Sequence, residues 1–545
     1  MLGRIKKIWS ALGKKEQRAL VAAVVLGVIS LGTLTATKIS DSTVVVPARG
    51  GTYVEGVVGQ PVGINPVTAA TETDKTLVRL IFSSLSDVAE KIESLPEREG
   101  RIWRIRLKEG VLWHNGEKLT SDDVIFTVRR IQESAELSPL FSNFQGVAAE
   151  RLSELELQFI TSRPYAFFES TLKNLFIAPK YIFGNIPLAN WRLSEFNLEP
   201  IGSGPFVFAS MEKDKNGFIR SYRLKANERH VKSPPLISNF IVRFFTKTEE
   251  AVESFNDGEA DGVAGVGAED IAKTKRPHEL ISLPFLNYYA IFLNQSKNTV
   301  LKDASVREAL SLAIDKKHLV EVVLGDYGHP VDGPLFITRE KAGGTESASE
   351  LLDRAGWTVR EDGVREKTEN KKTTELVISL TVPQVPFLVK TAGILESSWK
   401  AAGIKVETSI QSPKEVTETI IKNRDYEMLL FGNVLNQSKD LFSFWHSSER
   451  FHPGLNLAIY SSKKADAEIE GSRQNFSAEE RERLLEEAQK TILADSPAIF
   501  LYRPDYLYLT GKNLKGLSAK EEISSPGDRF RNVEKWYLET TRVWK

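Results

Sequence analysis

The 545-residue sequence contains no cysteine. Without a thiol the chain forms no disulfide, no thiolate nucleophile, no Fe–S cluster and no Cys-ligated zinc site, and no lipid can be attached through an N-terminal cysteine. Net charge is absent as well, because 72 Lys and Arg residues balance 72 Asp and Glu residues. Hydrophobic residues make up 41% and charged residues 26% of the chain, which excludes a disordered chain and a polytopic membrane protein. The length predicts three to four domains, at about 150 residues each.

One long apolar run stands near the start of this balanced sequence. Residues 1–18 form a basic stub with a net charge of +5, and the 19 residues that follow, 19–37, carry no charge. As a helix this run would be about 28 Å long, close to the thickness of the hydrocarbon layer of a bilayer. By the positive-inside rule the stub lies in the cytoplasm and everything after Lys38 lies outside. We therefore expect a transmembrane anchor at 19–37, with the lipid bilayer as its partner, and a linker at 38–49.

Two other interpretations of the run remain open. A cleaved signal peptide has a shorter apolar core, and a cut after Ala36 would place the bulky Leu34 three residues before the cleavage point. A buried helix of a soluble protein does not explain the flanking charges. With either an anchor or a signal peptide the body is exported. We expect a single-pass protein of the cell membrane whose body is extracytoplasmic, in the periplasm or on the cell surface.

The second half of the chain alternates strand and helix patterns. Predicted strands at 376–380, 404–408 and 426–431 are separated by predicted helices at 387–402 and 413–423. This alternation predicts a largely parallel sheet covered by helices.

Local signals mark the ends of several helices. Ser121 is the expected N-cap of a helix that follows an Asn-Gly turn. Asp315 is expected to cap a helix that Gly325 ends, and Ser477 with Glu480 has the pattern of a capping box.

The sequence shows no catalytic or metal-binding pattern. It contains no G-x-S-x-G elbow, no P-loop and no H-E-x-x-H motif. The closest pair of histidines, His446 and His452, is interpreted as surface or supporting residues and not as metal ligands. Residues 257–262 resemble the start of a calcium loop, but Ala268 stands where a bidentate Glu is needed, so we interpret them as an exposed turn. A glycosidase-like pair of carboxylates stays open, because the sequence gives no distances between its many acidic residues.

We therefore predict no cofactor, no metal and no catalysis. Nucleic-acid binding has no support, because the basic excess is confined to the membrane flank, where anionic lipid headgroups are the expected partner. A large, exported, tethered α/β protein without a catalytic pattern is typical of a binding protein.

Six segments of the exported part follow one another in a recognisable order. They are GGTYVEGVVGQPVGINP at 50–66, WRIRLKEGVLWHNGEKLTSDDVIFTVRR at 103–130, IGSGPF at 201–206, FNDGEADGV at 255–263, VREAL and AID within 303–325, and LLDRAGW at 351–357. In this order, from about Gly50 to the last residue, they resemble the family 5 extracellular solute-binding proteins, the dipeptide- and oligopeptide-binding group of ABC importers.

The resemblance implies an α/β fold of the class II periplasmic-binding-protein type, with two lobes and an extra domain, preceded in this chain by one N-terminal transmembrane helix. Lobes of this kind are joined by crossover strands and close over a ligand by hinge motion. On this pattern, lobe I comprises residues 50–82, 200–285 and 500–545, the extra domain comprises residues 83–199, and lobe II comprises residues 286–499.

The resemblance also implies where a ligand is held. In the peptide-binding members the ligand lies extended between the lobes and pairs with main-chain groups. Its amino group pairs with an Asp that follows the strand equivalent to 426–432, and a buried carboxylate there would contribute about 1.5–3 kcal/mol. Our alignment puts Asn436 at this position and Asp440 at the family's next acidic position. Asn436 can accept a hydrogen bond but carries no charge.

Three interpretations of this departure stay open. Asp440 has taken over the amine, or the ligand has no free amine, or the alignment slips by a few residues. Asp440 also fits as the cap of a helix at 441–446. The other candidate ligand-binding residues are Asn65, Gly432 and the aromatic residues Tyr288, Tyr289, Trp399 and Trp445, each of which also fits a position in the core.

These expectations combine into one function. We expect a membrane-anchored substrate-binding protein that delivers peptides or peptide-like solutes to an ABC permease, with a monomeric body. A ligand-sensing or interaction protein that uses the same hinge is one alternative. An exported hydrolase on the same fold is another, and the missing nucleophile–base pair disfavours it.

Overall fold

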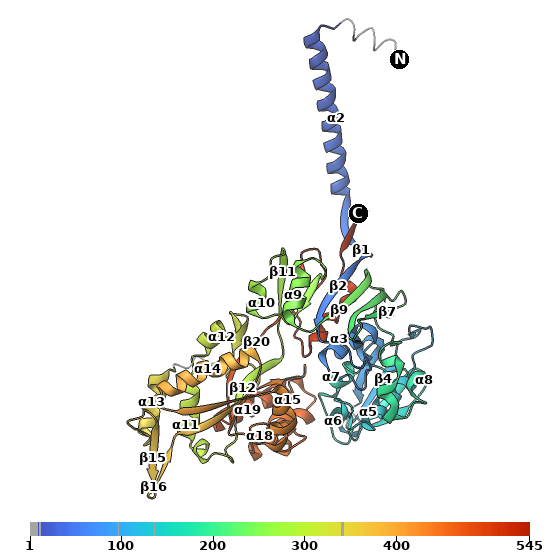
Figure 1. The fold of residues 1–545 in the computed structure, drawn as a ribbon. Coiled ribbons are helices and arrows are strands. Elements are labelled where there is room, and N and C mark those ends of the chain that lie inside the picture. Colours follow the sequence, from blue (N-terminus) through green and yellow to red (C-terminus); the bar gives the residue numbers. More distant parts are fainter. Residues whose placement is uncertain (1–8, 10–11, 96, 136, 339–342) are drawn as a thin grey trace.

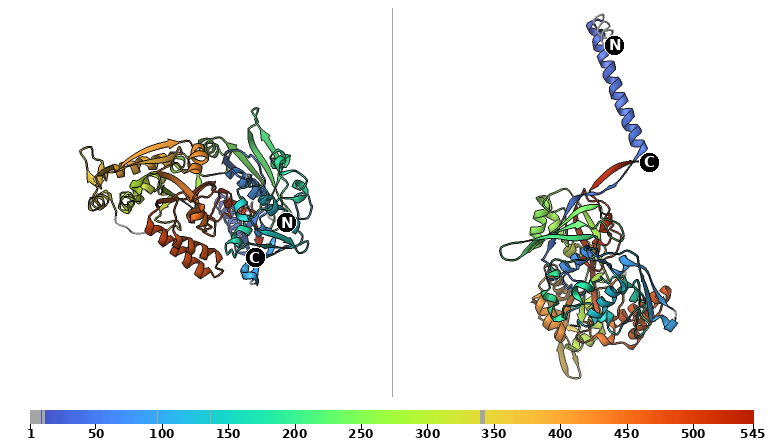
Figure 2. Two further views of the ribbon diagram at one scale, coloured as in Figure 1. Left: turned by 90° about the horizontal axis from the view of Figure 1, so that it is seen from below. Right: turned by 90° about the vertical axis from the view of Figure 1, so that its right-hand side faces the viewer.

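The computed structural model describes residue 9 and residues 12–95, 97–135, 137–338 and 343–545. A long helix, α2 (Lys14–Ser42), projects away from the body of the molecule (Figure 1, Figure 2). The expected apolar run lies inside α2, which continues for five residues beyond it at either end. Among the described residues, α2 is the one helix long and apolar enough to cross a membrane, and its apolar window is not buried against the body. Most of the predicted basic stub lies outside the described residues.

The interpretation of residues 38–49 as a linker needs correction. Residues 38–42 are the last part of α2, and β1 (Thr43–Ala48) follows at once. β1 pairs antiparallel with β22 (Glu539–Trp544) in a two-stranded ribbon that connects α2 to the body (Figure 1). The β-branched run Val44–Val46 favours an extended chain, but its partner strand comes from the other end of the sequence and leaves no local signal.

Lobe I is built on a seven-stranded sheet. Its strands are, in sheet order, β11 (His278–Leu283), β21 (Tyr506–Gly511), β10 (Gly262–Ala264), β2 (Gly50–Val58), β9 (Ile237–Phe245), β8 (Ile219–Ala226) and β7 (Phe206–Lys213). Its helices are α3 (Glu72–Ile81), α9 (Thr248–Asn256) and α10 (Ala268–Ala272). The expected exposed turn at 257–262 is present at residues 257–259 and leads toward β10, but Ala260 is buried and Gly262 already belongs to the strand.

The extra domain lies beside lobe I and has a four-stranded sheet of its own. Its strands are, in sheet order, β3 (Ala89–Leu95), β4 (Ile102–Leu107), β6 (Glu156–Ile160) and β5 (Ala148–Arg151). Its helices are α4 (Leu85–Val88), α5 (Ser121–Gln132), α6 (Phe141–Phe144), α7 (Phe168–Lys173) and α8 (Lys180–Phe183). The prediction for Ser121 was wrong by one residue. Thr120 is the N-cap of α5, because the Asp123 carboxylate accepts from the Thr120 N–H at 2.9 Å and closes a capping box there.

Lobe II is built on a six-stranded sheet. Its strands are, in sheet order, β13 (Gly328–Pro330), β20 (Ala498–Pro504), β12 (Asn287–Leu293), β19 (Met428–Val434), β17 (Val377–Pro383) and β18 (Lys405–Gln411). A small sheet of β14 (Thr358–Val359), β15 (Arg365–Glu369) and β16 (Lys372–Glu375) extends from its far end (Figure 1). Its helices are α11 (Ala304–Leu312), α12 (Lys316–Leu324), α13 (Thr345–Arg354), α14 (Pro386–Ala401), α15 (Pro413–Glu415), α16 (Ile421–Asn423), α17 (Phe442–Trp445), α18 (Lys463–Gln474) and α19 (Ala478–Asp495).

The prediction of a largely parallel sheet in this half was only partly right. β17 pairs parallel with both β18 and β19, as the alternation of strands and helices requires. β12 pairs antiparallel with β19 and with β20, and β13 pairs antiparallel with β20, so β12 and β13 run against the other four strands. Each of the three main sheets takes its strands from one of the proposed units, lobe I, the extra domain or lobe II. The exception is β20, which spans the proposed limit between residues 499 and 500. The domain limits themselves stay a proposal.

The expected N-caps in lobe II are confirmed, but the capping box of Ser477 with Glu480 is only half formed, because the Ser477 N–H donates to Oδ1 of Asn475. Asp315 accepts from the backbone N–H of His318 at the start of α12, and Gly325 ends that helix in the left-handed conformation with φ 59°. Ser477 accepts from the N–H of Glu480 at the start of α19. These signals were readable because each cap depends on residues within one helical turn.

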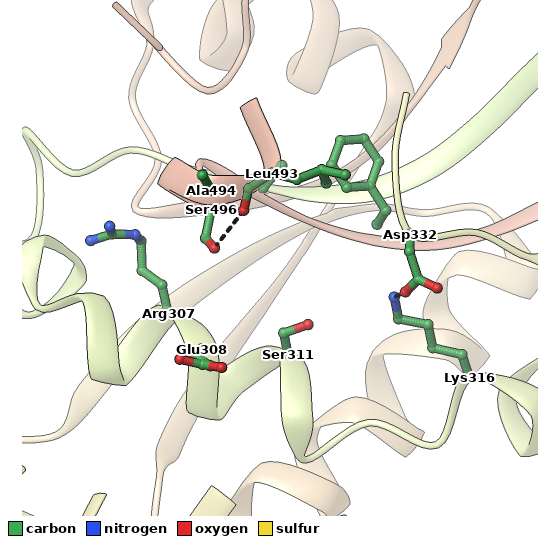
Figure 3. Close-up of a pocket in the computed structure, with 10 residues that line it drawn as sticks. Arg307, Glu308, Ser311, Lys316, Asp332, Leu493, Ala494 and Ser496 are labelled. Atoms are coloured by element: carbon green, nitrogen blue, oxygen red, sulfur yellow. Dashed lines mark hydrogen bonds and ion pairs between the residues drawn. The ribbon is translucent and has the colours of Figure 1, made fainter. Parts of the chain in front are cut away.

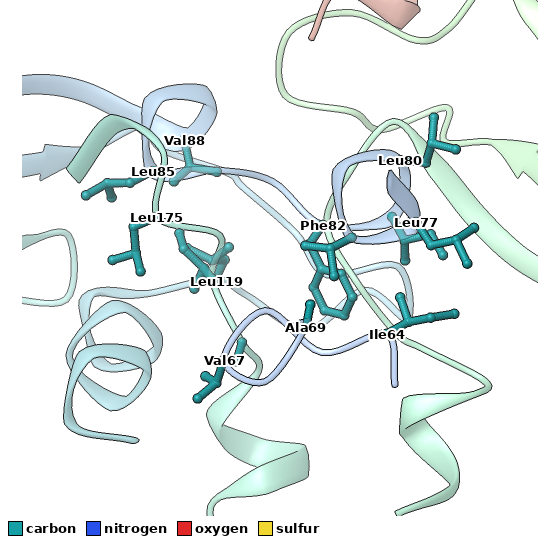
Figure 4. Close-up of a cluster of buried hydrophobic side chains, with 14 of the residues drawn as sticks. Ile64, Val67, Ala69, Leu77, Leu80, Phe82, Leu85, Val88, Leu119 and Leu175 are labelled. Carbon is teal, nitrogen blue, oxygen red and sulfur yellow. The ribbon is translucent and has the colours of Figure 1, made fainter. Parts of the chain in front are cut away.

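Buried side chains join lobe I and the extra domain into one core. A single hydrophobic cluster runs from Ile64, Leu77 and Phe82 of lobe I to Leu85 and Val88 of the extra domain (Figure 4). Lobe II has two clusters of its own, to one of which Phe167 of the extra domain contributes.

Candidate functional site between the lobes

The chain crosses between lobe I and lobe II twice, at neighbouring places. The first crossing lies between β11 and β12 and the second between β20 and β21, where the ring centroids of Phe285 and Tyr506 are 5.9 Å apart. The N–H of Leu286 donates to the carbonyl of Ile523 at 2.8 Å, and the N–H of Ile523 donates to the carbonyl of Pro284 at 2.9 Å. Two adjacent crossings of this kind form a hinge.

The edge of the lobe II sheet next to these crossings holds the carboxyl ends of its parallel strands. β17, β18 and β19 end there, β12 begins there directly after the first crossing, and β20 ends there just before the second. In open α/β sheets, ligands bind in the crevice outside the carboxyl ends of the strands. We therefore take this sheet edge, together with the loops that face it, as the candidate site.

Tyr289 lies on this edge and depends on Gly432. The two residues face one another across β12 and β19, and a Cβ atom on Gly432 would lie 2.7 Å from Cε1 of Tyr289. The Tyr289 ring packs edge-on against Phe387 at the start of α14, with centroids 5.1 Å apart. It also packs against Tyr502 in a tilted arrangement, with centroids 5.7 Å apart. Burial raises the pKa of Tyr289, so its hydroxyl is neutral at physiological pH.

Asp440 is buried in a set of internal partners behind the same edge. Its Oδ2 accepts from the Tyr165 hydroxyl at 3.2 Å and lies 3.2 Å from Nε of Arg473. Its Oδ1 accepts from the N–H of Phe442 at 3.0 Å, at the start of α17. Burial raises the pKa of Asp440, and the charge of Arg473 opposes this shift. Asp440 thus binds the first backbone N–H of α17, although Leu441 and not Asp440 holds the N-cap position.

Asn436 is exposed and closes the turn that leads to Asp440. Its Oδ1 accepts from the Ser438 hydroxyl at 2.7 Å and from the N–H of Asp440 at 3.2 Å. Lys439, between them, reaches lobe I and lies 3.2 Å from the carboxylate of Glu522. We call residues 435–440 the boundary loop, because neighbouring residues in it contact lobe I and the extra domain.

The other predicted site residues lie inside the protein. Asn65 is fully buried, where its Oδ1 accepts from the N–H of Val67 at 3.0 Å and shapes a turn. The Tyr288 hydroxyl accepts from Asn433 at 2.9 Å and from the indole N–H of Trp445 at 3.2 Å, and both aromatic side chains are buried. Trp399 is also fully buried, with its indole N–H donating to the carbonyl of Leu310 at 2.9 Å. These three aromatic residues thus occupy the core positions that the sequence left open for them.

The site combines half-buried aromatic rings, strand ends and charges that are paired within the protein. Such a surface suits a ligand held through stacking and main-chain hydrogen bonds, because its charged groups already have partners.

Comparison with known proteins identifies the group to which this arrangement belongs. The family model for bacterial extracellular solute-binding proteins, family 5 Middle, matches residues 86–451, more than half of the chain. The chain belongs to this family. The resemblance inferred from the six sequence segments is confirmed.

Individual family 5 proteins align over nearly the whole chain. The oligopeptide-binding protein AppA of Bacillus subtilis (strain 168) is 27% identical, covering 96% of this chain and 99% of AppA. A solved structure of AppA from Bacillus subtilis in complex with a nonapeptide aligns with a TM-score of 0.72 and 26% identity, covering 91% of this chain and 100% of that one. A solved structure of the ABC transporter substrate-binding protein CtaP of Listeria monocytogenes aligns with a TM-score of 0.76 and 22% identity, covering 90% and 99%. These matches confirm the two-lobed α/β fold.

Two residues beside the candidate site could not be predicted from the sequence. Tyr165 lies in the extra domain and Arg473 on α18, 275 and 33 residues away from Asp440. Arg473 is one of three basic residues on the charged helix α18, and Tyr165 stands in an irregular segment. Only the folded chain brings them to one carboxylate.

Two cavities of this family 5 protein lie away from the lobe II sheet edge that we take as the candidate site. One, with a volume of about 240 Å³, lies between α11 and α19, and the ion pair of Lys316 with Asp332 forms part of its wall (Figure 3). The other lies on the extra domain near Asp122 and Lys180. In the part of the chain that the structure describes, no group of three or more His, Asp or Glu side chains is arranged to hold a metal. His446 stacks on Phe442, with ring centroids 4.3 Å apart.

Proposed function

We propose that the chain is an extracytoplasmic substrate-binding protein that holds a peptide or peptide-like solute between its lobes and delivers it to an ABC permease in the membrane. The observation that carries this proposal is the match to AppA over both full chains, including the structure that contains a nonapeptide. Relatives that are solute-binding proteins favour binding without turnover, so the ligand is expected to leave this protein chemically unchanged.

The ligand of this proposal lies against the sheet edge that holds Tyr289 and Gly432. The half-buried Tyr289 ring offers a face or edge for an apolar side chain, and the strand ends beside it offer main-chain groups to an extended ligand. Closure of lobe II toward lobe I about the two crossings then covers the ligand.

The amino group of the ligand is proposed not to need a charged partner. Asn436 is neutral and its oxygen is used within the boundary loop. Asp440 has its charge compensated by Arg473 and accepts from Tyr165 and from a backbone N–H. Among the three interpretations of the sequence, this arrangement favours ligands without a free amine, including blocked and cyclic peptides.

The body is proposed to be tethered to the outer face of the cell membrane by α2 as a single-pass anchor. The family consists of extracellular solute-binding proteins, and α2 has the length and composition of a membrane span. A monomeric body is part of the same proposal.

Titration calorimetry of the full chain in nanodiscs against peptide pools of two to ten residues tests this function. Each pool is used with free and with acetylated amino termini, and we expect saturable binding whose affinity changes less than threefold on acetylation. Mass spectrometry of the released peptide should return its unaltered mass. If no pool binds or stabilises the protein, the peptide-binding proposal fails. If acetylation abolishes binding, the proposal about the amine fails alone, and shortened peptides would indicate a hydrolase.

A matched pair of variants tests the position of the ligand. Tyr289→Ala should weaken peptide binding at least tenfold, because it removes the aromatic surface at the sheet edge. Tyr181→Ala makes the same change at a 44% exposed position of the extra domain and should leave affinity unchanged. Equal affinities for the two variants would place the ligand elsewhere.

A further inference from the structure

The ribbon of β1 and β22 is joined to α2 without a spacer. α2 ends at Ser42 and β1 starts at Thr43. The N–H of Lys545 donates to the carbonyl of Ser42 at 2.9 Å, and the Arg542 guanidinium donates to Oγ1 of Thr43 at 3.0 Å. Both strands are thus held against the end of the helix (Figure 1).

Large apolar side chains are exposed on the part of the ribbon nearest the helix. Val44 and Val543, which lie opposite each other, are each 41% exposed, Val45 is 57% exposed and Trp544 is 72% exposed. By the alternation of side chains along a strand, Val44 and Val543 lie on one face of the ribbon and Val45 and Trp544 on the other. Burial in the protein core does not account for these side chains, and exposed large apolar side chains gathered at one place mark an interaction site.

Cationic side chains accompany this apolar surface. Lys38 precedes it in the last turns of α2, and Trp544 is flanked by Arg542 on β22 and by Lys545, which directly follows that strand. A tryptophan framed by basic residues is the combination favoured where a membrane meets water, because the indole tolerates both media and the cations attract lipid phosphates.

The length of helix beyond the apolar run places this surface at a definite depth. Thr43 follows Thr37 by six residues, so in a helix perpendicular to the membrane it lies about 9 Å beyond the end of the run. The headgroup layer of one leaflet is about 5–8 Å thick. Trp544 lies opposite Thr43, so its side chain is within reach of the outer part of that layer.

We propose that residues 43–45 and 542–545 form a collar that docks on the headgroup layer of the outer leaflet, with the Trp544 indole among the headgroups and Arg542 and Lys545 on lipid phosphates. Continuity with α2 selects this occupant, since an anchored helix delivers the collar to the lipid surface. The inference rests on the proposed anchoring by α2 and adds a second membrane contact. The collar sets the depth of the helix and holds lobe I at a constant distance from the bilayer.

The missing cysteines allow a direct test, because any introduced thiol is unique. The full chain carrying Trp544→Cys, Thr540→Cys or Val28→Cys is labelled with the environment-sensitive dye NBD and placed in vesicles of phosphatidylcholine with 25% phosphatidylglycerol. Thr540 is the matched control, since it lies on the same strand about 13 Å farther from the helix. Val28, exposed in the middle of α2, reports whether the helix spans the bilayer.

We expect the label at 544 to be quenched by nitroxide lipids labelled in the headgroup and to be at least threefold less accessible to iodide than the label at 540. Adding Arg542→Gln and Lys545→Gln should weaken the headgroup quenching at 544. Equal iodide quenching at 544 and 540, with the label at 28 buried among the acyl chains, would overturn the collar and leave the anchor intact. A label at 28 that is open to iodide would overturn the anchor as well.

Discussion

The extra domain meets lobe I and lobe II through two boundaries of different construction. Toward lobe I the hydrophobic core is continuous, and the backbones are hydrogen-bonded: the N–H of His114 in the extra domain donates to the carbonyl of Gly202 in lobe I at 2.7 Å. Gly202 is so closely packed that a Cβ atom on it would lie 1.9 Å from the carbonyl oxygen of Ile81 in the same lobe. Toward lobe II the Tyr165 hydroxyl contacts the ion pair of Asp440 and Arg473. Aromatic rings also meet there, because Phe167 joins a lobe II cluster and Trp103 packs against Phe476 with centroids 6.1 Å apart. The first boundary has no room for movement. The second combines polar contacts, which can be exchanged for others, with a few ring contacts.

This difference indicates which part of the molecule moves. Because they share one hydrophobic core, we expect lobe I and the extra domain to move as one unit, with lobe II swinging on the two crossings. The boundary loop of lobe II touches both halves of this unit, at Glu522 and at Tyr165. Changes at the first boundary should therefore alter the stability of the fold, and changes at the second should alter the balance between open and closed forms.

The largest effect is expected from Gly202→Ala at the lobe I boundary. The added methyl group would overlap the Ile81 carbonyl, so the free energy of unfolding should fall by about 3 kcal/mol or more in urea titrations. Gly63→Ala is the control in the same lobe, because a Cβ atom added there would meet no atom of the described residues within 4 Å beyond its own chain neighbours. Similar stabilities of the two variants would show that this boundary can relax.

At the same boundary, His114 should lower the free energy of unfolding by up to about 3 kcal/mol when the pH falls. Burial lowers the pKa of His114 to about 4 from its ordinary value of 6.5, and its Nε2 lies 3.1 Å from the Gly204 carbonyl oxygen. Between these values the unfolded imidazole binds a proton that the folded one does not, so stability should be lost as the pH falls from 6.5 to 4.

Urea titrations at several pH values measure this loss. His114→Gln should be less stable than the unaltered chain at pH 7.5 but should lose less stability on acidification. Parallel pH profiles of the two proteins would rule out His114 as a source. His230 is a second contributor, because burial lowers its pKa to about 4 also, and it should account for part of the remaining slope.

A smaller effect, about 1 kcal/mol, is expected from Tyr165→Phe at the lobe II boundary. The variant loses the hydrogen bond to Asp440 and keeps the packing of the ring. A double-mutant cycle with Asp440→Asn should give a coupling energy of about 1 kcal/mol. Distances between spin labels on the two lobes should broaden toward open forms in Tyr165→Phe. A coupling near zero would show that the boundary is held by packing alone.

The smallest effect is expected from Lys439→Gln. The pair of Lys439 with Glu522 is partly exposed at both side chains, so its contribution to stability should be below about 1 kcal/mol. The difference from the unaltered chain should disappear at 1 M salt, where exposed charges are screened. A difference that persists at high salt would point to the contact of Lys439 with the Phe336 ring, 5.8 Å from its centroid.

The two boundaries also show what a sequence can and cannot predict. The cap at Asp315 and the glycine stop at Gly325 were readable, since each is decided within one turn of helix. Tyr289 and Gly432 were both named from the sequence, but only their register across two strands shows that the ring needs the glycine. The partners of Asp440 were not predictable, because an ion pair between distant segments depends on distances that composition does not contain.

The same limit applies to the ends of the chain. The apolar run predicted the helix, while the pairing of β1 with β22 joins residues almost 500 positions apart and turned an expected linker into a ribbon. The mixed direction of the lobe II sheet has a similar origin, since β12 and β20 are placed by the crossings and not by the local alternation of strands and helices.

No flexible segment separates α2 from β1, and this affects how the protein would meet a transporter. A body on a flexible tether samples a hemisphere of positions and all orientations, and its local concentration at a membrane partner falls as the tether lengthens. If α2 anchors the protein as proposed, a body mounted on this short ribbon keeps lobe I toward the bilayer and holds lobe II and the extra domain on the side away from it (Figure 1). Its search for a partner is then reduced to sliding in the plane of the membrane and turning about one axis.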